Sequence, residues 1–436
     1  MAIAAVMILM ASSCRKDGNS EVLSTIPSNT EMFVVANLQQ INEKLGNKVG
    51  SNGEVTIGAP LEMLLRNSGK DGQTMREMLQ SNEAGLDFNA SLAIFEYKGS
   101  QVVTFYVVDP GQFRDFGKSK GEKFTEKAGV WESDGRVFMK DNQVWVSSGA
   151  STFTATTVQM LSGLDEKESL QGVPYACELV EGDADLSGWL NIKGLGSAMY
   201  SGNMVANVAV NTLFESPAYL PFTVKFNDGN AVAEVKMLDD KFKPSKYLLR
   251  GNDINMEAVN SYQGKGDVFF AISLDPEQMK ELGSKFGPLM GQMTPLFDLL
   301  ASIDGTVVGS ADSKQPASFG LLVNFLSPEK AAQASEQLAS LMPGSNSVVD
   351  LSGSKLYIHS PGLEGEEIGK YAADMKGSAF AFVMGSAKVM NGEDYINKVV
   401  LKGQRSGDSL VVTLKIDTKP GQNALKSLVE LAAKSR

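Results

Sequence analysis

The chain contains few of the residues from which metal sites, nucleophilic sites and disulfides are built. Its 436 residues include one histidine, His359, and two cysteines, Cys14 and Cys177. A zinc site needs several imidazoles or thiolates, and a Ser–His–Asp triad would have to use His359 alone. His359 ends the strand-like segment LYIH, where a similar segment ends in Lys140, and such variation is typical of a surface position. We therefore predict no catalytic residue, no metal site and no cofactor, and we expect a protein that is not an enzyme.

Positive charge is also scarce. The chain has 40 Lys and Arg against 51 Asp and Glu, a formal net charge of -11. Binding to nucleic acid needs clustered Lys and Arg, so this balance argues against a nucleic-acid partner. The segment GLGSAM (194–199) lacks the third glycine of a dinucleotide-binding loop, and no Walker-type loop occurs.

An apolar run stands at the beginning of the printed sequence. Residues 1–10 read MAIAAVMILM, too short for a membrane-spanning helix but typical of a signal-peptide core. The run leads into Ala11-Ser12-Ser13-Cys14, where small residues allow a peptidase to approach the backbone and the thiol can accept a diacylglyceryl group. We predict a signal peptide over 1–13 and a lipid on Cys14. Because no Lys or Arg precedes the run, we expect the natural start to lie upstream.

The residues that follow Cys14 are polar and turn-forming. They read RKDGNSE over 15–21, which predicts a lipidated flexible tether over 14–25. The pair Lys16-Asp17 resembles part of the surface-export signal of Bacteroidetes lipoproteins. We therefore expect an outer-membrane protein, and the sequence is compatible with both the periplasmic face and the cell surface.

The rest of the chain repeats itself. Each of five apolar blocks has a counterpart later in the chain, in the same order. The pairs are 33–38 with 270–274, 101–113 with 317–331, 133–140 with 352–359, 186–199 with 377–390, and 227–240 with 405–418. This order predicts two homologous halves, 26–250 and 251–436, each α+β with largely antiparallel strands and packed helices.

Local signals predict where helices begin and end in both halves. Asp109-Pro110 and Ser327-Pro328 are helix N-caps followed by a proline in the first turn. Leu45-Gly46 and Leu282-Gly283 predict helix ends, because glycine adopts the left-handed conformation at low cost.

Several residues allow a functional reading beside a structural one. Asp183-x-Asp185-x-Ser187-Gly188 resembles the start of a calcium loop, although position 12 would be Gly194 and the following residues look like a strand. The acidic loop of Glu364, Glu366 and Glu367 is most simply solvated. The remaining candidates are interpreted as core residues: Trp131, Trp145 and Trp189, which could otherwise stack on sugars, and Cys177.

The lipobox and two phrases suggest a family. IPSNTEMFVVANLQQI (26–41) and KGDVFFAISLDPEQM (265–279) resemble a family of Bacteroidetes envelope lipoproteins catalogued as a domain of unknown function. The resemblance implies an envelope location, and it implies no activity and no catalytic residue.

Three functions are compatible with the sequence. The first is a lipid-anchored, non-enzymatic binding or interaction scaffold, whose partners are the membrane, through the lipid on Cys14, and an unknown envelope protein or ligand. The second is a periplasmic or surface hydrolase with paired carboxylates, which requires two acids in one pocket. The third is a lipid carrier, suggested by Met-rich apolar helices at 194–214 and 287–303.

Overall fold

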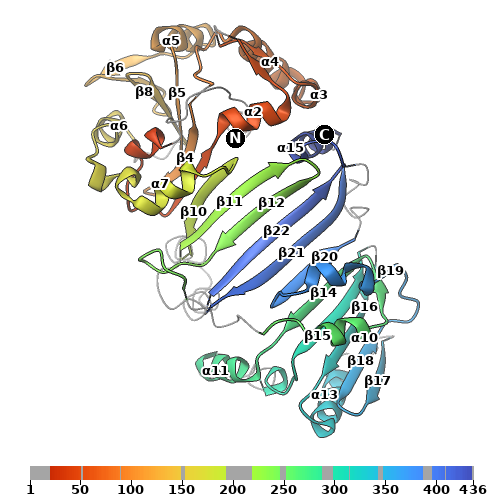
Figure 1. Ribbon diagram of the computed structural model, residues 1–436. Coiled ribbons are helices and arrows are strands. Elements are labelled where there is room, and N and C mark those ends of the chain that lie inside the picture. Colours follow the sequence, from red (N-terminus) through yellow and green to blue (C-terminus); the bar gives the residue numbers. More distant parts are fainter. Residues whose placement is uncertain are drawn as a thin grey trace. The chain divides into compact units, whose positions relative to one another are not determined.

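The structure is a computed structural model of the chain (Figure 1). It describes residues 20–50, 53–88, 90–148, 153–192, 219–245, 252–286, 298–313, 315–341, 347–385, 395–407 and 409–434. The predicted signal peptide, Cys14 and most of the two Met-rich segments lie outside these ranges. Within the described ranges, no helix combines the length and the apolar character needed to cross a membrane.

The described residues fall into two compact units. Unit 1 lies within Met1–Asn191, Leu220–Ala231 and Thr418–Arg436, and unit 2 lies within Ile192–Tyr219 and Val232–Asp417. Each unit is therefore assembled from segments that are distant in sequence. The predicted halves, 26–250 and 251–436, were defined by similar blocks of sequence, whereas the two units are compact bodies. The halves remain a prediction.

Unit 1 is built on antiparallel strands. β1 (Met32–Ala36) lies between β10 (Leu186–Asn191) and β4 (Leu92–Tyr97). β4 pairs with β5 (Ser100–Tyr106), and β5 pairs with β9 (Gln143–Ser147). Beyond β9 follow three strands in the order β8 (Val137–Lys140), β7 (Val130–Ser133) and β6 (Thr125–Lys127), while β11 (Tyr219–Asn227) lies beside β10.

Helices enclose the core of unit 1. Leu45 of α2, Leu61 of α3 and Val429 of α15 pack with Val103 and Phe105 of β5 in one cluster of buried side chains. The helices are α2 (Leu38–Leu45), α3 (Ala59–Asn67), α4 (Gly69–Ser81), α5 (Pro110–Ser119), α6 (Ala155–Leu161), α7 (Pro174–Glu181) and α15 (Ala424–Lys434). The short elements are η1 (Glu21–Thr25), β2 (Lys48–Val49), β3 (Val55–Thr56), η2 (Glu166–Glu168) and η3 (Leu170–Gly172).

The ordered body begins earlier than the sequence suggested. The end of the predicted tether 14–25 forms η1, in which Val22 and Leu23 are fully buried. The hydroxyl of Thr25 accepts a hydrogen bond from Nε2 of Gln143 at 2.9 Å, which attaches η1 to β9. Residues 21–25 therefore belong to the folded body, because their apolar side chains find a buried site that is distant in sequence.

Unit 2 has antiparallel strands of its own. β14 (Val268–Ser273) lies between β20 (Phe380–Met384) and β15 (Thr306–Asp312). β15 pairs with β16 (Gln315–Asn324), and β16 pairs with β18 (Lys355–His359). The further strands are β12 (Asn230–Lys236), β13 (Lys265–Gly266), β17 (Val348–Ser352), β19 (Glu366–Glu367), β21 (Ile396–Ser406) and β22 (Ser409–Thr418).

Two clusters cover opposite faces of the unit 2 strands. On β18, Leu356 and Ile358 join one cluster, which contains Ala331 of α13. Tyr357, between them, joins the other cluster, because neighbouring residues in a strand face opposite sides. The helices of unit 2 are α10 (Met256–Ser261), α11 (Pro276–Phe286), α13 (Pro328–Leu341), η5 (Ile368–Tyr371) and α14 (Ala372–Met375).

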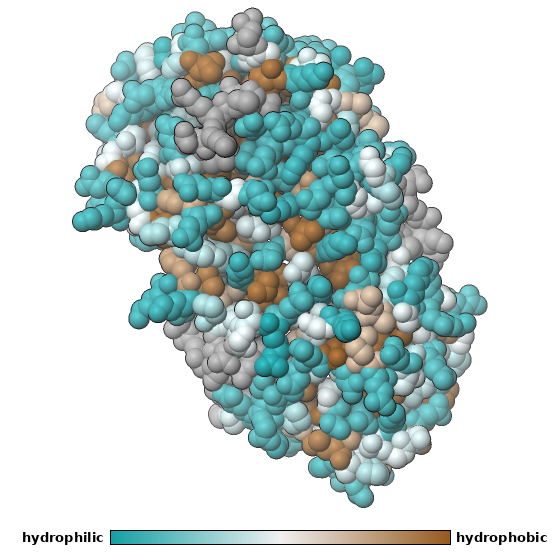
Figure 2. All heavy atoms as spheres, viewed as in Figure 1, coloured by the Kyte–Doolittle hydropathy of each residue, from teal (hydrophilic) through white to brown (hydrophobic). Residues whose placement is uncertain are grey.

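Most large apolar side chains of the described residues are buried. Figure 2 shows hydrophilic residues predominating on the face in view, with apolar residues in small groups. Among the described residues, the exposed large apolar side chains are Val108, Met160, Leu326, Val348, Leu351 and Phe382.

The two units use the same order of strand pairing. In unit 1 the order is β10, β1, β4, β5, β9, β8. In unit 2 it is β20, β14, β15, β16, β18, β17. The protein is therefore α+β with mostly antiparallel strands, as the sequence predicted.

The strand register changes two of the correspondences drawn from sequence. The segment 352–359 contains β18, whose structural counterpart is β9 rather than the β8 segment 133–140. The amide of Asn37 donates to the carbonyl of Asp185, and the amide of Ser273 donates to that of Ala379, both at 2.8 Å. Trp189 therefore corresponds to Val383 and not to Phe380. The segment AFAFVM (379–384) is apolar at every position, so its pattern does not distinguish one register from another.

The helix signals were mostly correct. Oδ1 of Asp109 accepts the amides of Gly111 and Gln112 at 2.8 and 3.0 Å, and α13 begins at Pro328. Gly46 ends α2 in the left-handed conformation, with φ 78°. The end predicted at Gly283 is wrong, because α11 continues to Phe286.

Candidate functional site

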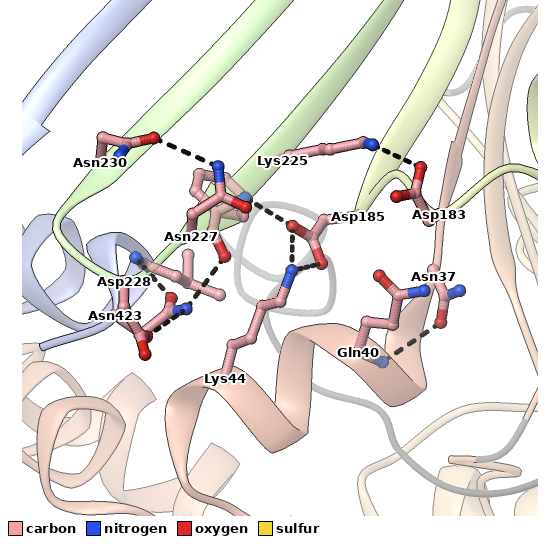
Figure 3. Close-up of polar contacts among 12 residues, drawn as sticks. Asn37, Gln40, Lys44, Asp183, Asp185, Lys225, Asn227, Asp228, Asn230 and Asn423 are labelled. Atoms are coloured by element: carbon pink, nitrogen blue, oxygen red, sulfur yellow. Dashed lines mark hydrogen bonds and ion pairs between the residues drawn. The ribbon is translucent and has the colours of Figure 1, made fainter.

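A buried charged group with several partners lies at the start of β10. The side chain of Asp185 is fully buried, and Nζ of Lys44 lies 2.7 Å from its Oδ1 and 2.6 Å from its Oδ2. Figure 3 shows the neighbouring Asp183 directed to a different cation, Lys225. The two acids of the segment that resembles a calcium loop therefore serve two separate ion pairs, one buried and one exposed.

Helix α2 positions Lys44. The helix begins after Asn37, whose side chain accepts the amide of Gln40 at 3.2 Å, and it ends at Gly46. Lys44 lies in the last turn, where a cation is favoured by the exposed helix carbonyls. The apolar face of α2, with Ile41 and Leu45 buried, fixes the helix on the core. The ammonium group is thereby held against Asp185.

Asp185 has a further partner on β11. The amide of Phe226 donates to Oδ2 of Asp185 at 2.6 Å. The carbonyl of Phe226 in turn accepts a hydrogen bond from Nδ2 of Asn423 at 2.9 Å, just before α15 (Figure 3). The carboxylate thus connects α2, β10 and β11, and the Phe226 peptide extends the connection to the C-terminal helix.

This arrangement leaves little room for metal chemistry. The ammonium group of Lys44 occupies the position between the two carboxylate oxygens of Asp185 that a metal cation would take. Asp183 is well exposed, and its hydrogen bond with Lys225 lowers the pKa of its carboxyl. Among the described residues, no group of three or more His, Cys, Asp or Glu side chains is placed to hold a metal ion. The site acts as a clamp within unit 1.

No local signal could have revealed this clamp. Lys44 and Asp185 are separated by 141 residues. The sequence pointed to Asp183 and Asp185 as a pair, whereas the fold separates them and gives each its own lysine. Only the pairing of β1 with β10 brings α2 over Asp185.

His359 ends β18, which lies between β16 and the edge strand β17 in unit 2. Its ring stacks on Tyr357 with centroids 4.8 Å apart, and its Nε2 lies 3.3 Å from Oδ2 of Asp350. By strand pairing its counterpart is Ser147 rather than Lys140. His359 therefore makes the contacts of a partly exposed surface side chain with Tyr357 and Asp350.

Cys177 lies on α7 and is partly buried. Its Sγ donates to the carbonyl of Gln171 at 3.3 Å. Burial, and then the charges of Glu181, Glu166 and Glu178, raise the pKa of the thiol. These surroundings disfavour the thiolate, which is the nucleophilic form.

The tryptophans differ in their accessibility. Trp145 and Trp189 are fully buried, so neither ring offers a face to a sugar. Trp131 is half-buried, and the guanidinium of Arg114 lies 4.4 Å from its ring centre. The interpretation of Trp145 and Trp189 as core residues is confirmed.

The acidic loop of unit 2 is partly ordered by its own neighbours. Glu366 accepts hydrogen bonds from the hydroxyl of Tyr371 and, at 2.6 Å, from Nζ of Lys370. Glu367 lies opposite Lys265 in the β13–β19 pair. Burial, followed by the bond to Glu366, raises the pKa of Tyr371. Glu366 is bound into the fold, whereas Glu364 and Glu367 are exposed.

An open hollow in unit 1 contains three acids. It measures about 580 Å³ and is lined by Glu83, Asp109, Gly111, Gln112, Asp115, Phe116 and Ser119. Oδ1 of Asp109 caps α5, and the hydrogen bond from Lys118 at 2.8 Å lowers the pKa of Asp115. A glycosidase needs an acid with a raised pKa, so Asp115 is unsuited to that role.

A carboxylate pair missed in the sequence lies at the start of β1. Burial, and then the charge of Glu96, raise the pKa of Glu31. The pair is brought together by β1 and β4, which are neighbouring antiparallel strands. The hollow described above does not include either acid.

We expect Glu31→Gln to stabilise the protein at pH 7 and to have little effect at pH 4. A carboxyl whose pKa is raised on folding costs stability as the pH rises above its ordinary value of 4.5, and that cost is absent at lower pH. Urea unfolding at both pH values measures the difference. Glu126→Gln, at an exposed position of β6, is the control and should not change the pH dependence. Equal effects of Glu31→Gln at both pH values would contradict the prediction.

Comparisons of the chain with protein-family models, with curated proteins and with solved structures found no match.

Proposed function

We propose that this protein is a lipid-anchored envelope protein whose body is a duplicated, non-enzymatic scaffold for binding another envelope component. Cys14 carries the lipid, residues 1–13 are removed as a signal peptide, and the outer membrane is its location. The proposed partners are the membrane, through the lipid, and an envelope protein or ligand held by the body.

The main support for a scaffold is the use that the fold makes of its charged groups. The buried carboxylate of Asp185 is bound by Lys44 and by the amide of Phe226. In unit 2, Lys398 bridges Asp374 and Asp417 at 2.9 and 3.4 Å. Groups used in this way hold strands and helices together and have no free position for a substrate.

The matching strand order supports a duplication of the scaffold. β1 lies between β10, which follows α7, and β4, the first strand of a hairpin, and it leads into α2. In the same way β14 lies between β20, which follows α14, and β15, the first strand of a hairpin, and it leads into α11. Two copies of one architecture in one chain suit a protein that offers binding surfaces to a partner.

The distance between the anchor and the body is limited by chain length. Ser20, the first described residue, follows Cys14 by six positions. Six residues span at most about 20 Å even when fully extended. A lipid on Cys14 would therefore keep unit 1 close to the membrane surface.

Metabolic labelling tests the anchor. Cells expressing the gene are grown with an alkyne-bearing fatty acid, and the protein is then coupled to a fluorophore. We expect a labelled protein in the membrane fraction, and we expect Cys14→Ala to lose the label and leave that fraction. Cys177→Ala, which removes the other cysteine, is the matched control and should keep both properties. Labelling that survives Cys14→Ala would refute the anchor.

A further inference from the structure

β17 forms an open edge in unit 2. Within the described part of the chain, it pairs with β18 alone. The two strands are joined by the two-residue turn Gly353-Ser354, so the closing pair Ser352–Lys355 is hydrogen-bonded. Hydrogen-bonded and non-hydrogen-bonded pairs alternate along an antiparallel ladder. The N–H and C=O groups of Val349 and Leu351 therefore point outward, away from β18. Such a row of backbone groups is a template for another strand.

The equivalent edge in unit 1 is occupied. β8, the counterpart of β17, pairs with β9 on one side and with β7 on the other. The segment between α5 and β8, 120–136, provides the hairpin of β6 and β7. Only residues 342–347 lie between α13 and β17. Unit 1 thus has the strand β7 at a position where unit 2 has no strand among its described residues.

The side chains at this position of the two units also differ in how far they are buried. Pairing with β9 and β18 makes Met139 the counterpart of Leu351. Met139 lies opposite Trp131 of β7 and is 1% exposed, whereas Leu351 is 47% exposed. Val348, on the same strand, is 40% exposed. The edge therefore has apolar side chains that an added strand would cover.

The charge on the edge restricts what can be added. Asp350 is the counterpart of Phe138, which lies opposite Glu132 of β7. A like charge placed directly across a strand pair is unfavourable, and an opposite charge is favourable. Antiparallel pairing of two β17 strands with Asp350 opposite Asp350 is disfavoured for the same reason.

We propose that the outer edge of β17 binds an extended segment of another envelope protein as an additional antiparallel strand. The segment has an apolar side chain opposite Leu351 and a Lys or Arg opposite Asp350. Backbone hydrogen bonds provide the affinity and these two positions provide the specificity, as in other cases of strand addition. The inference rests on the binding role proposed for the body and names the class of its partner.

Two synthetic peptides test the edge. The first copies the β6–β7 hairpin, residues 123–134, and the second carries the Glu132→Lys change; both are labelled with fluorescein and titrated with the intact protein in detergent. We expect the Lys peptide to bind about five-fold more tightly than the Glu peptide, from the favourable pair with Asp350. Asp350→Lys should reverse this preference. Hydrogen exchange should show new protection at β17.

Variants of the protein locate the binding. Leu351→Lys places a charge on the edge and should abolish peptide binding, and its exposed position makes the substitution compatible with folding, which circular dichroism checks. Thr125→Lys, on the outer strand β6 of unit 1, is the matched control and should bind as the parent does.

Three results would overturn the proposal. They are equal binding of the two peptides, protection outside β17, and a dimer in sedimentation experiments that Leu351→Lys dissociates, since the last would make a second copy the occupant. Labelling of Cys14 is independent of these measurements, so failure at the edge is distinguishable from failure of the anchor.

Discussion

Lys44→Met is expected to lower the free energy of unfolding by about 3–5 kcal/mol, because it leaves the buried Asp185 without its cation. The carboxylate of Asp185 has no exposed surface. In the variant, its remaining partner among the described residues is the backbone amide of Phe226. Methionine preserves the length and the apolar stem of the lysine, so the loss reports mainly the missing charge. Urea unfolding followed by far-ultraviolet circular dichroism measures it.

The neighbouring ion pair provides the control. Lys225→Met breaks the pair with Asp183, whose side chain is 83% exposed, and should cost less than about 1 kcal/mol. The double variant Lys44→Met/Asp185→Asn should recover most of the loss, because the amide oxygen still accepts the bond from Phe226 and no unpaired charge remains. A similar cost for Lys44→Met and Lys225→Met would contradict the role of the clamp.

Trp189→Ala is expected to lower the free energy of unfolding by about 3–5 kcal/mol through the cavity that it leaves. Trp189 is fully buried, its ring meets that of Phe33 edge-on at 4.5 Å, and its Nε1 donates to the carbonyl of Thr30 at 3.3 Å. The side chain thus joins β10 to β1 at the centre of unit 1. Differential scanning calorimetry and urea unfolding measure the change.

Trp131→Ala is the comparison, since Trp131 is half-buried and packs beneath Arg114. Its loss should cost about 1–2 kcal/mol. If Trp131→Ala proved the more damaging change, the assignment of Trp189 as the central core residue would be wrong.

Local physical chemistry explains the parts of the fold that the sequence determined. The N-cap at Asp109 and the left-handed Gly46 depend on groups only a few residues away. The alternation of apolar residues similarly predicts strands and an α+β protein, because the period of two is intrinsic to a strand.

The sequence was less informative wherever one segment had to be matched to another. Gly283 has the residue type of a helix end, yet α11 continues through it. Val22 and Leu23 look like part of a polar tether until their buried site is known. The alignment of Trp189 with Phe380 was three residues out of register, because β20 is apolar at every position and its pattern is satisfied by more than one register.

Tertiary structure alone decided the candidate sites. Asp185 and Lys44 are 141 residues apart, and only the pairing of β1 with β10 makes them neighbours. The open edge of β17 likewise has no signature in the residues VVDLS, and it becomes visible when β7 is found beside β8. The sequence by itself determined the class of the fold, and the lipid proposed for Cys14 rests on the sequence alone, since both depend on adjacent residues. Clamps and free edges depend on which distant segments the folded chain brings together.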